Sequence, residues 1–124
     1  MKALGQTLSA LAVLFLAVDA VGKLLRLPPV MAGTGELGYP ENAVLVIGLL
    51  EAACVAAYVA PPTAILGALL LTGYLGGAVA THLRVGNPVW SHILFPVYVA
   101  LFVWGGLFLR EARLRALLPL RLAR

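Results

Sequence analysis

Four apolar segments, each near the ~20 residues that a helix needs to cross a bilayer, constrain the fold of this chain more than any other feature. Their approximate bounds are 5–25, 42–60, 63–82 and 89–109. Of the 124 residues, 62% are hydrophobic and only 11% are charged, so the chain lacks the polar side chains that coat a soluble domain. We therefore predict an all-α, antiparallel bundle of four transmembrane helices that forms a single integral membrane domain over residues 1–124.

Prolines and small residues predict where these helices end and how they pack. Pro61 and Pro62 separate the second segment from the third, so the two helices that they join must be antiparallel neighbours. Pro96 lies inside the fourth segment and is expected to bend that helix. The motifs GxxxA at 48–52 and GxxxG at 73–77 predict faces where helix backbones approach closely.

The first loop, from Arg26 to Glu41, mixes apolar side chains with glycines. Its larger apolar and aromatic residues are Val30, Met31, Leu37 and Tyr39. This composition suits a short helix or a re-entrant segment that covers one end of the bundle. An ordinary flexible connection is the alternative.

Positive charge is concentrated near the C-terminus and predicts the orientation of the chain. Five of the nine Lys and Arg residues lie in the last fifteen positions: Arg110, Arg113, Arg115, Arg121 and Arg124. Together with Lys2, they place both termini in the cytoplasm, as an even number of spans requires. The tail contains no aromatic residue, which argues against nucleic-acid binding and favours contact with anionic lipid.

Three ionisable residues, Asp19, Lys23 and Glu51, lie inside the apolar segments. Since an ionised side chain at the centre of a spanning helix costs roughly 2.5–3.5 kcal/mol, such residues need partners or a function. Asp19 and Lys23 are spaced i,i+4 with the acid first, which predicts an ion pair on one helical face. Glu51 has no basic neighbour one turn away, so it is either protonated or paired with another helix. Its candidate partners are Lys23, His82, Arg84 and His92.

The polar residues of the apolar segments are predicted to lie at similar depth. With the N-terminus inside, Asp19 and Lys23 lie in the outer third of their helix and Glu51 lies near the midplane. Both histidines fall at the outer ends of the third and fourth segments, without the spacing of a metal-ligand motif. This distribution predicts a polar pocket in the outer half, with mutual neutralisation of the charges as the alternative. The candidate pocket residues are Asp19, Lys23, Glu51, Tyr74, Thr81, His82, Arg84 and His92.

Several short motifs, taken together, resemble the DoxX-like family over nearly the whole chain. They are DAVGKL at 19–24, LGYP at 37–40, GLLE at 48–51, TGYLGGA at 72–78, THLRVG at 81–86 and FP at 95–96. The resemblance implies a small four-helix protein of the bacterial inner membrane. It assigns no catalytic role to any of the pocket residues.

The resemblance leaves two functional hypotheses open. The namesake members are associated with a thiosulfate:quinone oxidoreductase, which implies an amphiphile-binding subunit, with a quinone as its cofactor, accessory to a quinone-linked enzyme. A distantly similar animal protein is an assembly chaperone, which implies a non-enzymatic factor whose polar cavity receives part of a partner membrane protein. Association with a second copy of the chain is a separate expectation. The single cysteine, Cys54, excludes dithiol redox chemistry within the chain, so catalysis of its own would need a bound redox group.

Overall fold

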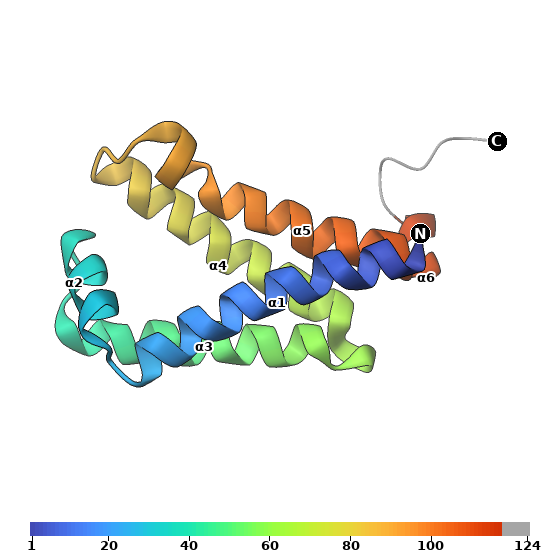
Figure 1. Ribbon diagram of the computed structural model, residues 1–124, viewed down its shortest axis with the longest axis horizontal. Helices are drawn as coiled ribbons and strands as arrows, with labels where there is room; N and C mark the ends of the chain where they lie inside the picture. The colour runs from blue at the N-terminus through green and yellow to red at the C-terminus, as the bar shows by residue number, and fades with distance from the viewer. Residues whose placement is uncertain (118–124) are drawn as a thin grey trace.

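The computed structural model describes residues 1–117, and all of their regular secondary structure is helical. The long helices are α1 (Lys2–Leu24), α3 (Glu41–Val59), α4 (Ala64–Arg84) and α5 (Phe95–Arg110) (Figure 1). The shorter elements are α2 (Pro28–Glu36), the 3₁₀ turn η1 (Pro61–Thr63), the π-helical turn η2 (Val89–Ile93) and α6 (Ala112–Leu117). The predicted all-α bundle of four long helices is confirmed, and Arg121 and Arg124 of the basic tail lie outside the described residues.

Four helical stretches are long and apolar enough to cross a membrane. They are Lys2–Leu24, Glu41–Val59, Pro61–Arg84 and Val89–Arg110. Helix α1 packs against α3 and α5, and α4 packs against the same two helices, so each long helix has two antiparallel neighbours. The N-terminus and α6 lie at one end of this bundle, which we call the N-terminal end. Helix α2 and η2 lie at the other, which we call the α2 end (Figure 1).

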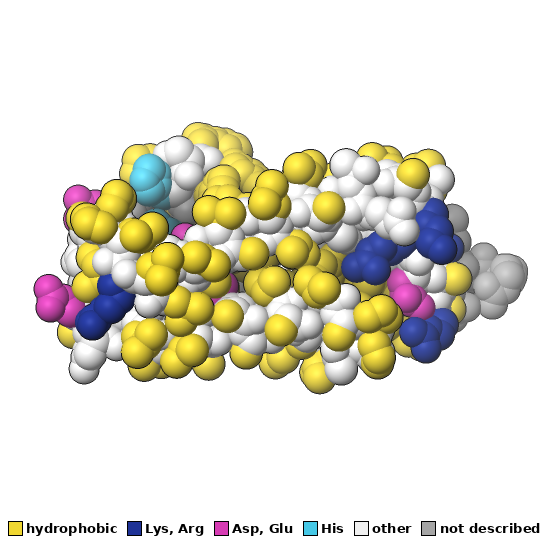
Figure 2. All heavy atoms as spheres, turned by 60° about the horizontal axis from the view of Figure 1, so that its bottom comes forward, with side chains coloured by type: hydrophobic (Ala, Val, Ile, Leu, Met, Phe, Trp, Pro, Cys, Tyr) yellow, Lys and Arg dark blue, Asp and Glu magenta, His cyan; other side chains and the backbone are white. Residues whose placement is uncertain are grey.

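Large apolar side chains cover the outside of all four spans. One leucine on each span illustrates this: Leu14, Leu50, Leu69 and Leu101 are 62%, 58%, 57% and 65% exposed. Figure 2 shows hydrophobic side chains along the length of one face, with Lys and Arg side chains gathered towards its two ends. In water this surface would be unfavourable, whereas against lipid chains it costs nothing. The outer surface is therefore that of a membrane protein.

Glycines set the closest contacts between the helices. A Cβ atom added to Gly5 would lie 2.7 Å from the carbonyl oxygen of Gly106, and one added to Gly48 would lie 2.8 Å from Cβ of Lys23. A Cβ atom added to Gly67 of α4 would lie closer still to the backbone of Tyr58 on α3. These contacts confirm the small face predicted at Gly48.

The second glycine motif was predicted to be a packing face, and this prediction was wrong. A Cβ atom added to Gly73 or to Gly77 would meet no other heavy atom within 4 Å. Both residues line an open space at the α2 end instead. A small residue permits close packing but does not enforce it, so the motif alone could not distinguish the two outcomes.

Prolines begin helices in this chain. Pro28 and Pro29 occupy the first turn of α2, where a missing N–H breaks no hydrogen bond, and this gives the first loop its predicted short helix. Pro96 likewise lies in the first turn of α5. The expected bend of the fourth span falls at Leu94, between η2 and α5, just before the proline.

Replacing Gly67 by Ala should destabilise the bundle, because the new methyl group would collide with the backbone of α3 at Tyr58. We expect a loss of roughly 1–3 kcal/mol, seen as a lower melting temperature of the detergent-solubilised protein. The matched control is Gly76→Ala on the same helix, where the added Cβ meets no atom within 4 Å. Equal melting temperatures for the two variants would contradict the packing described here.

Candidate functional site

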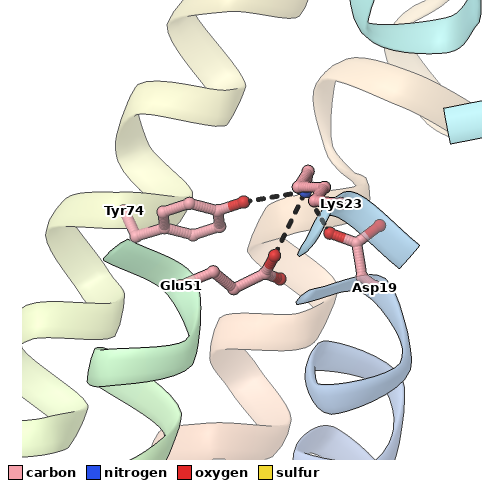
Figure 3. Close-up of polar contacts among 4 residues, drawn as sticks. All are labelled: Asp19, Lys23, Glu51 and Tyr74. Carbon is pink, nitrogen blue, oxygen red and sulfur yellow. Dashed lines mark hydrogen bonds and ion pairs between the residues drawn. The ribbon is translucent and has the colours of Figure 1, made fainter. Parts of the chain in front are cut away.

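The ammonium group of Lys23 joins three helices at the α2 end (Figure 3). It donates hydrogen bonds to Oδ2 of Asp19, one turn earlier on α1, to Oε1 of Glu51 on α3 at 3.1 Å, and to the hydroxyl of Tyr74 on α4 at 3.0 Å. The i,i+4 pair of Asp19 and Lys23 is thereby confirmed. Of the four partners considered for Glu51, the structure selects Lys23. All three N–H donors of the ammonium are in use.

The four side chains, which we call the charge cluster, are buried to different degrees. The side chain of Glu51 is 1% exposed, that of Lys23 is 13% exposed and that of Asp19 is 34% exposed. Two carboxyl groups share one ammonium, so the cluster holds one more acid than base. Among residues 1–117, Oε2 of Glu51 is the buried side-chain polar atom left without a hydrogen-bond partner. Such an atom costs about 1–3 kcal/mol unless something binds it.

A cavity of about 700 Å³ lies beside the charge cluster at the α2 end. Its polar walls include Thr81, His82 and His92 in addition to the four cluster residues, and helix α2 lines one side through Val30 and Thr34. Its apolar walls are formed by side chains of α1, α3, α4 and α5, among them Phe15, Leu16, Leu50, Leu75, Phe95 and Val99. This volume falls within the range of small-molecule binding sites.

The two histidines lie together at the turn between α4 and α5. Their ring centroids are 5.7 Å apart in an edge-to-face arrangement. Nδ1 of His82 lies 2.7 Å from the amide nitrogen of Asn87, and Nδ1 of His92 lies 2.8 Å from the hydroxyl of Ser91. Within residues 1–117, no group of three His, Cys, Asp or Glu side chains is arranged to hold a metal ion.

Arg84 and Thr81 hold the connection between α2 and α3 against α4. Nη2 of Arg84 donates to the carbonyl oxygen of Leu37 at 2.6 Å, and the hydroxyl of Tyr39 lies 2.9 Å from that of Thr81. Arg84 does not line the cavity, although its depth along the helix is close to that of His82. Tyr39 and Asn87 do line it, and sequence reasoning missed both. The signals for Tyr39 were its place in the LGYP motif and its place in the loop expected to cover one end of the bundle.

The fold and the lipid-facing surface define the class of this chain as a multi-pass integral membrane protein. A family model described as the DoxX-like family matches residues 7–106, a range that contains the whole charge cluster. The chain belongs to the DoxX-like family. No curated protein and no solved structure matches it significantly.

Replacing Lys23 by Met should destabilise the protein strongly, because it leaves two carboxyl groups without their shared cation. We expect a loss of about 3–5 kcal/mol, measured by thermal unfolding in detergent. The control is Lys2→Met, an exposed lysine at the start of α1.

A rescue experiment distinguishes the loss of the Lys23 charge from the loss of the contacts made by its side chain. The triple variant Asp19→Asn, Lys23→Met, Glu51→Gln removes the charges together and should recover much of the lost stability. If Lys23→Met and the wild type have the same melting temperature, the ion pairs do not stabilise the bundle.

Proposed function

We propose that this DoxX-like membrane protein binds a small amphiphile with a carbonyl-bearing head group, of the quinone class, in the cavity at the α2 end. The observation that carries the proposal is the buried Glu51, which lines a cavity of about 700 Å³ and whose Oε2 lacks a hydrogen-bond partner among residues 1–117. A ligand in the cavity could satisfy this carboxyl group in either protonation state: the protonated acid donates to a quinone carbonyl, and the carboxylate accepts from the hydroxyl of the reduced quinol.

Hydrogen-bond donors in the cavity support a carbonyl head group. The hydroxyl of Tyr74 accepts from Lys23, so its own proton is free to be donated to a ligand. Nδ1 of His82 faces the amide nitrogen of Asn87, which places the proton of the neutral ring on Nε2. A carbonyl oxygen accepts from either group, and a quinone carries two such oxygens.

The apolar walls support an occupant that comes from the bilayer. Phe15, Leu50 and Phe95 line the cavity, yet they are 44%, 58% and 40% exposed on the lipid-facing surface of the bundle. Side chains that face both the cavity and the lipid give a hydrocarbon tail a continuous apolar path. A water-soluble ligand would gain nothing from these walls.

The proposed function also concerns the orientation of the chain in its membrane. The charges of Lys2 and of the C-terminal arginines favour cytoplasmic termini, and the family favours the bacterial inner membrane. The cavity then lies in the outer half of the bundle. The family resemblance further suggests that the protein serves as an accessory subunit of a quinone-linked oxidoreductase, in which the chain supplies binding and the electron transfer belongs to its partners.

Removing the free donor of Tyr74 should weaken binding of a quinone. We expect Tyr74→Phe and Glu51→Gln to bind decylubiquinone about tenfold more weakly than the wild type, measured by native mass spectrometry of the purified protein. The matched control is Tyr98→Phe, which removes a hydroxyl bonded to the carbonyl oxygen of Trp90, away from the cavity lining. Unchanged affinity in both cavity variants, or no binding to the wild type, would overturn the proposal. Loss of a co-purifying membrane protein in Glu51→Gln would then favour the chaperone hypothesis.

Reporter fusions should reveal the proposed orientation. A green fluorescent protein fused after Arg124 should fluoresce, because it folds in the cytoplasm, and alkaline phosphatase inserted after Gly86 should be active, because it folds outside. Gly86 lies in the turn between α4 and η2, at the α2 end. The reverse pattern would place the cavity in the cytoplasmic half instead.

A further inference from the structure

A basic groove lies at the N-terminal end of the bundle, opposite the cavity. It has a volume of about 400 Å³ and runs between the start of α1, the end of α5 and α6. The residues that line it are Met1, Lys2, Leu109, Arg110, Ala112 and Arg115. The lining contains three basic side chains and no acidic one. Lys and Arg side chains gather at this end of the molecule in Figure 2.

The guanidinium group of Arg110 is held in place from the inside of the bundle. Its Nε donates to the hydroxyl of Ser9 at 3.0 Å, and its central carbon lies 5.6 Å from the ring centroid of Tyr58. Ser9 in turn lies 2.8 Å from the hydroxyl of Tyr58, which donates to the carbonyl oxygen of Val103 at 2.7 Å. Ser9 and Tyr58 are 6% and 1% exposed, so this anchor is rigid.

The fixed arginine retains donors that this network does not use. Only Nε of Arg110 is engaged by Ser9, which leaves the two terminal amino groups for a ligand on the groove side. Arg115 is also positioned, because its Nη1 donates to the carbonyl oxygen of Phe108 at 2.6 Å. A planar guanidinium with fixed orientation suits the oxygens of a phosphate group, with little entropy left to lose on binding.

Nothing in the described part of the chain neutralises the groove. The ion pairs within residues 1–117 join Lys23 to Asp19 and Glu51, and Arg113 to Glu111. The acidic residue nearest in sequence, Glu111, is therefore bound by Arg113, which does not line the groove. The charges of Lys2, Arg110 and Arg115 have no carboxylate partner there.

The depth of the groove matches that of lipid phosphates. Helix α1 has 23 residues and is about 34 Å long, slightly more than the hydrocarbon thickness of about 30 Å. Lys2, at the end of its span, therefore lies at the level of the head groups, and the guanidinium of Arg110 lies about two helical turns below it, beside Ser9. Leu109 in the groove and Leu4, which is 47% exposed on α1, offer contact to the acyl chains below.

We propose that this groove binds the phosphate of an anionic phospholipid, with Arg110 as the oriented donor and with Lys2 and Arg115 as supporting charges. The site is separate from the cavity at the α2 end and does not depend on the function proposed for it. Basic pockets at the ends of transmembrane helices recognise anionic head groups by this chemistry. Zwitterionic lipids should bind weakly, because their ammonium group offsets the attraction.

The test measures lipid retained by the full-length protein in native mass spectrometry, with phosphatidylglycerol or phosphatidylcholine added to the detergent. The wild type should retain phosphatidylglycerol preferentially, and the double variant Lys2→Gln, Arg115→Gln should bind it about tenfold more weakly. Both side chains are exposed, so the double variant should fold. The matched control is the double variant Glu111→Gln, Arg113→Gln, because it replaces two side chains at the same end, outside the groove lining, without freeing the carboxylate of Glu111, and it should bind as the wild type does.

Three results would overturn the proposal. The first is equal retention of the two lipids by the wild type, and the second is an equal loss of phosphatidylglycerol in Glu111→Gln, Arg113→Gln and in Lys2→Gln, Arg115→Gln. In the third, inorganic phosphate displaces the lipid at a matched concentration, which would indicate a free-phosphate site. A final variant, Arg110→Lys, keeps the charge but cannot bond Ser9 and present a planar fork to a phosphate at once, so it should also lose preference for phosphatidylglycerol.

Discussion

The Lys23 ammonium, set between the carboxyl groups of Asp19 and Glu51, is the interaction on which this bundle depends. Three ionisable groups in an apolar environment are tolerated only where they neutralise one another. The close approach of α1 and α3 at Gly48 makes this possible, because it brings the stem of Lys23 against the backbone of α3. Glu51 lies one turn further along the same face, within reach of the ammonium.

The two ends of the bundle satisfy their polar groups in different ways. At the N-terminal end, hydrogen bonds run from Nε of Arg110 through Ser9 and Tyr58 to a backbone carbonyl, and the buried hydroxyl groups of Ser9 and Tyr58 all have partners. At the α2 end, the charge cluster uses every donor of Lys23 and still leaves Oε2 of Glu51 unbound. The buried hydroxyl groups at the N-terminal end therefore fix the side chain of Arg110, whereas the buried carboxyl group beside the cavity is only partly satisfied by the protein.

Hydropathy and residue spacing predicted the features that depend only on position along the chain, namely the spans and the contacts within one helix. Bilayer thickness fixes helix length, so the four spans follow from composition, and the pair of Asp19 and Lys23 follows from i,i+4 spacing. Depth alone does not say which way a side chain points. Arg84 lies two residues beyond His82, a rotation of about 200° on a helix, and it contacts the loop after α2 instead of lining the cavity. For the same reason the sequence left four candidates for the partner of Glu51.

The missing packing of Gly73 and Gly77 explains why a cavity exists beside the cluster. These glycines leave open space on the face of α4 that lines the cavity, and the same helix presents Tyr74 to Lys23. Charge neutralisation and the proposed ligand binding therefore use different atoms of one cluster. The ammonium of Lys23 is committed to its three partners, whereas the hydroxyl proton of Tyr74 and Oε2 of Glu51 are not. The proposed ligand would therefore bind to these two polar atoms without breaking the ion pairs that neutralise the buried charges.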